Sequence, residues 1–329
     1  MEPFFPYLPG DAVYANLKEN ALRFGLLGEI EAAHLCEFAA EIFTAVPPAE
    51  LLSALPDHRL PDLSGAEFPG SVSPWMQNFH TARNLWQTAF LCRALSHLYV
   101  KSPGFSLRYL FPDASADPFP AVCRIVYPRN ANTDAAFSAF APFLSGASAE
   151  PRAVYTGNFI SACEEVAGGF CHCCILPLEN AAEGRINSSM RLIDRYELKI
   201  LSCCQLRRSS DSTGFTRFAL LGKQLSLPKV NSGNALFEVS IPAKDPSENT
   251  AIPLVAQLCG LRLSFADIRP CAEKTDRSLS YFSFFTCGDL PAFLFYLAME
   301  APHCTPVGFY AYPDAQTAKN TTNLQKKEL

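Results

Sequence analysis

Two stretches in the middle of the chain decide the fold: ILPLENAAEGRIN at residues 175–187 and GFTRFALLG at residues 214–222. Each contains a short apolar run, which predicts one buried strand at residues 171–177 and another at residues 215–221. Polar residues and a glycine follow the first run and lead into a predicted helix at residues 186–196. The two stretches therefore predict two strands and a connecting helix of an α/β layer.

Strands alternate with helices around these stretches. Alternation of this kind implies an α/β layer sandwich. The other strands are predicted at residues 122–127, 152–155 and 198–206, and the other helices at residues 134–143 and 158–167.

The C-terminal part of the chain follows a different order. Strand, helix, strand, strand, helix and strand succeed one another, and this βαββαβ order is that of the ferredoxin-like split βαβ fold. Residues 314–329 are polar, and we expect a flexible tail there. The strands are predicted at residues 235–242, 261–268, 278–286 and 305–312, and the helices at residues 250–259 and 290–300.

The N-terminal part, residues 1–115, is predicted to be mostly helical. Trp75, Phe79, Trp86 and Phe90 recur at helical spacing, which favours a long helix with a core or interface stripe over a cofactor-binding stripe. Prolines then mark a linker. The predicted domains are residues 1–115, 121–228 and 233–313.

Composition narrows the class of protein. The 329 residues are 49% hydrophobic and carry a net charge of −5, which speaks against a nucleic-acid partner. No apolar run reaches the ~18 residues of a membrane-spanning helix, so no membrane partner is expected. The first residues lack the basic region of a secretory signal, and the expected compartment is the cytoplasm.

The 13 cysteines are expected to be reduced and mostly buried. Cys171, His172, Cys173 and Cys174 stand together, but alternation along a strand directs only two of them to each face. A zinc site needs about four ligands. We therefore expect no metal and no cofactor.

The two central stretches resemble the "PIENS" and "NFTRF" motifs of prephenate dehydratases. The βαββαβ unit behind them resembles the ACT domain of that family: residues 266–270 stand where the family has "ESRP", and residues 307–313 resemble its "LGSYP" ending. The resemblance spans residues 122–313. It implies a periplasmic-binding-protein-like α/β dehydratase domain followed by a ferredoxin-like ACT domain.

The resemblance also implies an activity in L-phenylalanine biosynthesis, the conversion of prephenate to phenylpyruvate, CO₂ and water, and a homodimer held by ACT domains. It implies that Thr216 donates a hydrogen bond to the leaving hydroxyl. The other interpretation of Thr216 is that it simply reflects the strand propensity of threonine. It implies a regulatory amino acid near Asp267 and Arg269. The substrate-binding residues would be Glu179, Asn180, Gly184, Arg217 and Phe218.

The residues themselves add three expectations. Arg217 should point to the face opposite Thr216 and form an ion pair with Glu179. Asn180 either binds a substrate oxygen or caps the exit of its strand. The turn at residues 184–187 opens a helix whose free N–H groups favour an anion.

The chain also departs from the family. Only 35 residues, 181–215, separate Asn180 from Thr216, where the family has a whole second lobe. The sequence thus predicts a single-lobe domain with half of the substrate cleft. The loop at residues 127–134 lacks the glycines of the family's first motif, and Ile268 replaces the serine of "ESRP".

Two functions remain open. In the first, the protein binds an aromatic metabolite or amino acid, such as prephenate or L-phenylalanine, or regulates a partner, without turnover. In the second, it is an active prephenate dehydratase whose cleft is completed by a second subunit or by the N-terminal region. That region stands where bifunctional enzymes carry a chorismate mutase, but it lacks the spaced arginines of that module. An ACT scaffold is a third possibility.

Overall fold

The computed structural model describes residues 29–58, 60, 74–111, 114–115, 119–207, 214–227, 235–243, 249–270 and 278–312. Residues 1–28 of the predicted helical N-terminal part and the predicted C-terminal tail lie outside these residues. The described chain is a mixed α/β protein with an N-terminal helical segment, which confirms the predicted fold class.

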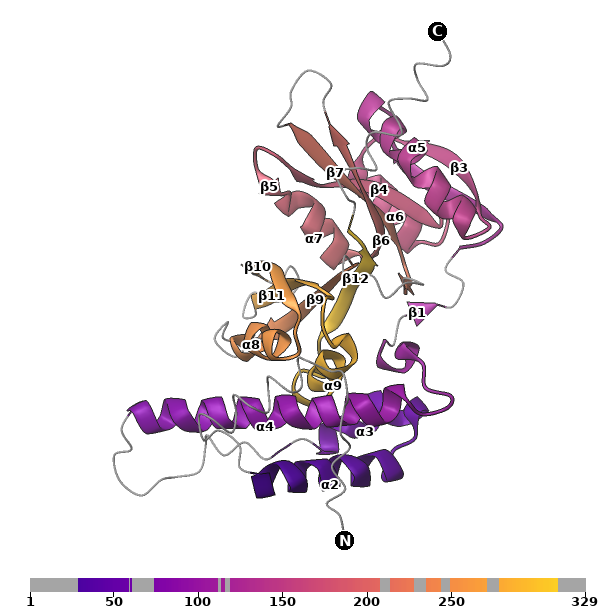
Figure 1. The fold of residues 1–329 in the computed structure, drawn as a ribbon. Coiled ribbons are helices and arrows are strands. Elements are labelled where there is room, and N and C mark those ends of the chain that lie inside the picture. The colour runs from indigo at the N-terminus through magenta and orange to yellow at the C-terminus, as the bar shows by residue number, and fades with distance from the viewer. Residues whose placement is uncertain are drawn as a thin grey trace. The chain divides into compact units, whose positions relative to one another are not determined.

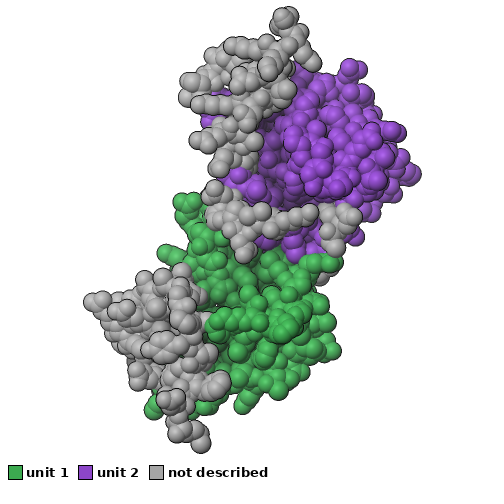
Figure 2. Space-filling view, turned by 45° about the vertical axis from the view of Figure 1, so that its right-hand side comes forward, with its two compact units in different colours: residues 1–112, 240–269, 278–305 green, residues 113–239, 270–277, 306–329 purple. Residues whose placement is uncertain are grey.

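The chain divides into two compact units (Figure 2). Unit 1 holds residues 1–112, 240–269 and 278–305, and unit 2 holds residues 113–239, 270–277 and 306–329. The N-terminal helices therefore share a unit with the helices of the βαββαβ element. The first and last strands of that element, β9 (Ala235–Ala243) and β12 (Thr305–Ala311), each pass from one unit into the other.

Unit 2 is built on an α/β sheet whose strands follow the order β12-β6-β7-β4-β2-β3. Strands β2, β3 and β4 are parallel, whereas β7 runs antiparallel to both of its neighbours. The strands are β2 (Val122–Pro128), β3 (Glu150–Thr156), β4 (Cys173–Asn180), β5 (Gly184–Arg185), β6 (Lys199–Arg207) and β7 (Phe215–Gly222), with β1 (Ala114–Ser115) paired to β8 (Leu225–Ser226). The helices are α5 (Ala131–Gly146), α6 (Phe159–Ala167) and α7 (Asn187–Arg195).

The apolar core of unit 2 lies between α5 and one face of the sheet. Phe140 and Leu144 of α5 pack there with Ile125, Ile175 and Phe218, all of them buried. Alternation along β7 places Thr216, Phe218 and Leu220 on this face and Arg217 on the other. The sheet thus separates an apolar side from a side that holds charged residues.

The βαββαβ element has the predicted order of helices and strands. Its strands hydrogen-bond in the order β10-β11-β9-β12, the arrangement of the split βαβ fold. Strand β10 (Arg262–Pro270) is therefore an edge strand. The other elements are α8 (Ala251–Leu258), β11 (Ser278–Phe285) and α9 (Leu290–Glu300).

In unit 1 the N-terminal helices cover α8 and α9. Helix α4 (Pro74–Val100) lies beside α2 (Glu29–Ala45), with α3 (Leu51–Ala54) between short 3-10 turns (Figure 1). Asp289 caps α9, and it accepts hydrogen bonds from Ser96 of α4 at 2.8 Å and from Ala292 N–H at 2.9 Å. It also pairs with the buried Arg93 of α4 at 2.9 Å. Of the predicted aromatic stripe of α4, Phe90 is buried and Trp86 is half-buried, whereas the side chains of Trp75 and Phe79 lie outside the described residues.

No single helix among the described residues is long and apolar enough to cross a membrane. One bent pair of segments, Ile30–Ala45 and Pro48–His58, passes the length and composition test only when the two are taken together, and they meet at 97°.

Candidate functional site

The motif at residues 175–187 forms a β-hairpin between β4 and β5. Asn180 pairs with Gly184, which has a φ of +69°, a backbone conformation that glycine adopts without strain. The side-chain oxygen of Asn180 accepts hydrogen bonds from the N–H groups of Ala182 at 3.0 Å and Glu183 at 2.7 Å. Asn180 and Gly184 therefore shape the turn that ends β4.

The second motif lies beside this hairpin. In the β4–β7 ladder Thr216 is opposite Asn180, and Arg217 is opposite Glu179. The side chains of Thr216 and Asn180 thus lie on the same face of the sheet, at the ends of adjacent strands, and Thr216 is half-buried. Phe218, on the same face as Thr216, is buried in the apolar core against α5.

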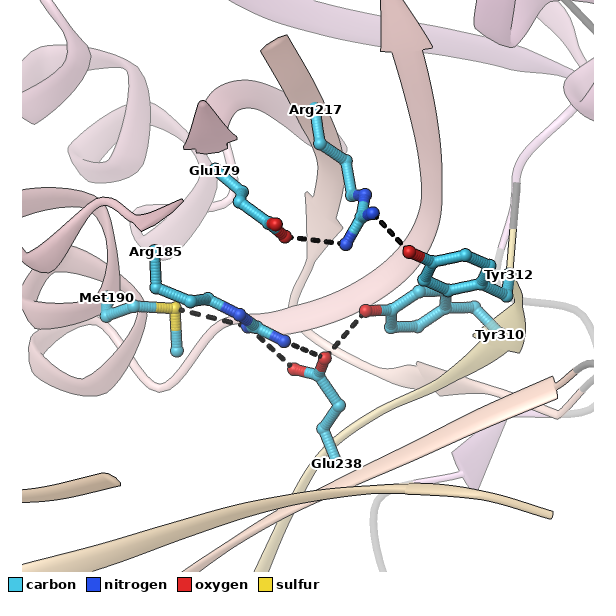
Figure 3. Close-up of polar contacts among 7 residues, drawn as sticks. All are labelled: Glu179, Arg185, Met190, Arg217, Glu238, Tyr310 and Tyr312. Atoms are coloured by element: carbon cyan, nitrogen blue, oxygen red, sulfur yellow. Dashed lines mark hydrogen bonds and ion pairs between the residues drawn. The ribbon is translucent and has the colours of Figure 1, made fainter. Parts of the chain in front are cut away.

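The expected ion pair between Arg217 and Glu179 is confirmed (Figure 3). Nη1 of Arg217 lies 2.6 Å from the Glu179 carboxylate, and the two side chains are 7% and 22% exposed. Nη2 of Arg217 donates to the Tyr312 hydroxyl at 2.5 Å, and the guanidinium carbon lies 4.6 Å from the centre of the Tyr312 ring. Within the described residues, the buried Nε of Arg217 has no hydrogen-bond partner.

A second charged pair lies beside the first, between Arg185 of β5 and Glu238 of β9 (Figure 3). Its two hydrogen bonds measure 2.5 and 3.2 Å, and the side chains are 7% and 0% exposed. The Tyr310 hydroxyl donates to Glu238 at 2.7 Å. Such a buried pair needs hydrogen bonds of this kind to offset the loss of hydration.

Sequence reasoning missed four members of this group: Arg185, Glu238, Tyr310 and Tyr312. One signal was available, because Glu238 is the single charged residue of the apolar stretch ALFEVSIPA at residues 235–243. A carboxylate inside a buried strand needs a cationic partner. We call Glu179, Arg185, Arg217, Glu238, Tyr310 and Tyr312 the arginine–glutamate cluster.

Cys203 of β6 lies next to this cluster but is not activated by it. Burial, followed by the charge of Glu238, raises the pKa of the Cys203 thiol well above its ordinary value. Because the thiolate is the reactive form of cysteine, Cys203 has the properties of a buried apolar residue.

The loop that aligns with the family's first motif ends at the N-terminus of α5. The Asn130 side chain accepts hydrogen bonds from the N–H groups of Asn132 and Thr133, both at 3.0 Å, and the Thr133 side chain accepts from Asn130 N–H at 3.1 Å. This capping box occupies donors that would otherwise be available to an anion.

In unit 1, Asp267 and Arg269 lie on the edge strand β10. Nε of Arg269 donates to the Asp267 carboxylate at 2.6 Å. The two terminal nitrogens of Arg269 are buried and have no hydrogen-bond partner in the described part of the chain. The guanidinium carbon lies 5.6 Å from the ring centre of Tyr281, whose ring contacts Phe265 edge to face. Among the described residues, this buried cation beside aromatic rings therefore leaves both terminal nitrogens without an acceptor.

The cysteines of β4 are packed as thiols. Cys123 and Cys173 have their sulfur atoms 3.8 Å apart, and a hydrogen bond with Cys163, together with burial, raises the pKa of Cys174. Over the described ranges, no group of three or more histidine, cysteine, aspartate or glutamate residues is arranged to hold a metal ion.

The chain matches no family model and no curated protein. It is similar to the prephenate dehydratase from Streptococcus mutans, with a TM-score of 0.45 and 16% identity over 58% of this chain and 100% of that one. It is also similar to the prephenate dehydratase in complex with L-Phe from Arthrobacter aurescens, with a TM-score of 0.44 and 15% identity over 63% and 98% of the two chains.

A further similar structure is GqqA, described as a novel type of quorum quenching acylase, with a TM-score of 0.44 and 14% identity over 58% of this chain and 95% of that one. The similar structures thus include prephenate dehydratases, the family whose motifs this chain resembles. Because the TM-scores are below 0.5, the function proposed below rests on the motifs and geometry of the chain itself.

Proposed function

We propose that this protein is a prephenate dehydratase-like protein that binds an aromatic amino acid or a related aromatic carboxylate and does not dehydrate prephenate. One observation carries the proposal. Glu179, Asn180 and Arg217 of the dehydratase motifs hydrogen-bond within the chain, whereas both buried terminal nitrogens of Arg269 have no partner among the described residues. We therefore infer that the motifs serve the fold of unit 2 and that the unused donors of Arg269 belong to a ligand site in unit 1.

The absence of turnover follows from how residues 181–215 are used. They form the hairpin strand β5, helix α7 and strand β6 before the chain returns to β7 at Phe215. A substrate beside Thr216 would be covered by one lobe alone. Hydrogen bonds in a wet site stabilise a developing charge far less than those in a closed one, so Thr216 would give little catalysis.

The proposed ligand follows from the chemistry around Arg269. A guanidinium takes a carboxylate through two parallel hydrogen bonds, and its unused terminal nitrogens match that geometry. The rings of Tyr281 and Phe265 provide an apolar, aromatic surface next to it. L-phenylalanine combines the carboxylate and the ring, and it is the ligand we propose to test first. Asp267 would hold Arg269 in place through Nε.

We further propose that the protein forms a homodimer through β10. The strand is at the edge of its sheet, and Leu263 and Ile268 on it are 44% and 57% exposed. A long, apolar edge strand needs a partner or a cover. A second β10 in antiparallel register would place Arg262 of each copy opposite Asp267 of the other, so the strand complements itself.

The alternative function is an active prephenate dehydratase with a cleft completed by a second subunit or by the N-terminal region. The pairing of Asn180 with Thr216 favours it, because the two motif residues lie side by side. The cytoplasm is the proposed compartment for either function.

Calorimetric titration of the full chain with L-phenylalanine tests the ligand site. We expect binding that weakens at least tenfold in Arg269→Gln and is unchanged in Arg207→Gln, an exposed arginine of β6 that serves as the matched control. Equal binding by the wild type and Arg269→Gln would overturn the proposed site.

A further inference from the structure

Strand β3 (Glu150–Thr156) is an edge strand of the sheet in unit 2 (Figure 1). It pairs in parallel with β2 on one side, and no strand of the described residues pairs with its other side. An edge of this kind presents backbone N–H and C=O groups that can bind an extended chain. We call this unpaired side of β3 the open edge.

The hydrogen bond from Glu150 N–H to the Ala121 carbonyl, at 2.8 Å, determines which backbone groups face the open edge. Since the backbone groups of Glu150 point to β2, alternation along the strand directs those of every second residue to β2 as well. The backbone groups of Pro151, Ala153 and Tyr155 therefore point outward. Because proline has no N–H group, the open edge offers the N–H groups of Ala153 and Tyr155 and the carbonyl groups of all three.

The side chains on one face of β3 form a charge pattern. Ala153 packs against the apolar core that α5 covers, so Glu150 and Arg152 lie on the opposite face of the sheet. Both are exposed, and neither has an ion pair among the described residues. Arg152 is directly opposite Arg124 of β2, which carries the same charge. An acidic side chain on the other side of Arg152 would offset this repulsion.

The other face of the open edge is apolar. Tyr155 is 51% exposed there, and its ring contacts Tyr127 edge to face, with the ring centres 5.5 Å apart. The guanidinium carbon of Arg129 lies 4.9 Å from the same ring. An apolar side chain on an added strand would cover part of the exposed ring. The open edge therefore favours a strand that is charged on one face and apolar on the other.

A second copy of β3 fits the open edge poorly. With Ala153 opposite Ala153, an antiparallel copy places both Glu150 and Arg152 opposite uncharged residues. The register that places Arg152 opposite Glu150 also places Pro151 opposite Pro151, and neither proline can donate a hydrogen bond. A strand of a different sequence can satisfy the charges and the hydrogen bonds together.

We propose that β3 is a docking strand for an extended segment of a partner protein, which adds to the sheet in the antiparallel direction. Antiparallel pairing is slightly more stable per residue than parallel pairing. The segment carries an acidic residue opposite Arg152, a basic residue opposite Glu150 and apolar residues on the face of Tyr155. This docking strand does not depend on the ligand site proposed at Arg269.

The test titrates the full chain with the capped peptide Thr-Ile-Thr-Val-Glu-Val-Lys, which has this pattern when it runs antiparallel to β3. The matched control peptide, Thr-Ile-Thr-Val-Lys-Val-Glu, has the same composition with its two charges exchanged. Amide hydrogen exchange followed by NMR reports where the peptide binds. The N–H groups of Ala153 and Tyr155 should exchange at least tenfold more slowly with the first peptide bound, whereas that of Val154, which faces β2, should be unaffected.

We expect the wild type to bind the first peptide at least about threefold more tightly than the control peptide, because two cross-strand charge pairs change sign. Glu150→Arg combined with Arg152→Glu changes two exposed side chains and should reverse this preference. An unchanged preference in that variant, or no slowing of exchange at Ala153 and Tyr155 in the wild type, would overturn the proposal. A wild-type dimer that is lost in a folded Ala153→Pro chain would also overturn it, because a second copy would then be the occupant.

Discussion

Two buried arginines, Arg217 in unit 2 and Arg269 in unit 1, use their donors in opposite ways. Glu179 and Tyr312 accept hydrogen bonds from the two terminal nitrogens of Arg217, and its Nε has no partner among the described residues. In Arg269 the Nε donates to Asp267, and within the same residues the two terminal nitrogens have no partner. We infer that an arginine whose two terminal nitrogens are bonded within the chain supports the fold, whereas one whose terminal nitrogens are both without a partner can bind an external acceptor.

The largest effect is expected from the buried pair that accompanies Arg217. Glu238→Ala leaves Arg185 as a buried charge without its main partner, and we expect the free energy of unfolding to fall by about 3–5 kcal/mol. Chemical denaturation measures it, with Glu183→Ala on the exposed hairpin loop as the control. A loss below about 1 kcal/mol would show that the pair does not support unit 2.

Replacing each of the two arginines by methionine tests the difference between them directly. Arg217→Met removes the partner of Glu179 and should lower the free energy of unfolding by about 1–3 kcal/mol. Arg269→Met removes a buried cation whose terminal nitrogens have no described partner, together with its ion pair to Asp267, which is 33% exposed, and should cost less stability than Arg217→Met. Equal losses in the two variants, measured by denaturation without ligand, would contradict the distinction.

A substitution in the hairpin turn should lower the free energy of unfolding by a smaller amount. Asn180→Ala removes the acceptor of two backbone N–H groups, those of Ala182 and Glu183, and should cost about 1 kcal/mol. Asn180→Asp keeps the acceptor and should recover most of that loss. If the alanine variant were as stable as the wild type, the asparagine would not be needed for the turn, and a role in ligand binding would regain weight.

The smallest effect concerns His172 and pH. Burial, followed by the charge of Arg124, lowers the pKa of His172, and its neutral Nδ1 accepts a hydrogen bond from Arg124 N–H at 2.9 Å. The folded state thus binds fewer protons than the unfolded state, so this contribution is complete above the ordinary pKa of 6.5 and is lost as the pH falls below it. The Tm of the wild type should fall more between pH 7.5 and 5.5 than that of His172→Gln, and parallel curves would refute this.

The pattern of apolar and polar residues along the chain predicted most of the helices and strands. The boundaries of α9 match the predicted residues 290–300, and the alternation of β7 correctly predicted that Arg217 would meet Glu179. Strand β4 begins at Cys173, two residues later than predicted, because the turn that follows α6 extends to Cys171, whose N–H donates to the carbonyl of Glu165. These features depend on neighbours in sequence or on one strand pairing.

The rest of the cluster depends on pairing between distant segments. Tyr310, Tyr312 and Glu238 reach Arg185 and Arg217 because β12 lies next to β6, and a single sequence does not specify this neighbour. The same limit applies to unit 1, where Asp289 joins α9 to Arg93 and Ser96 of α4. Polar residues in apolar strands and helices were the available signal, but their partners follow only from topology.

The central claim is that the dehydratase motifs of this chain are structural. The measurement that tests it most directly is the turnover of prephenate to phenylpyruvate by the purified full chain at neutral pH, beside Thr216→Ala. We predict no turnover by the wild type above that of the variant. Turnover that disappears in Thr216→Ala would contradict the account and establish an active dehydratase whose half-cleft is completed elsewhere.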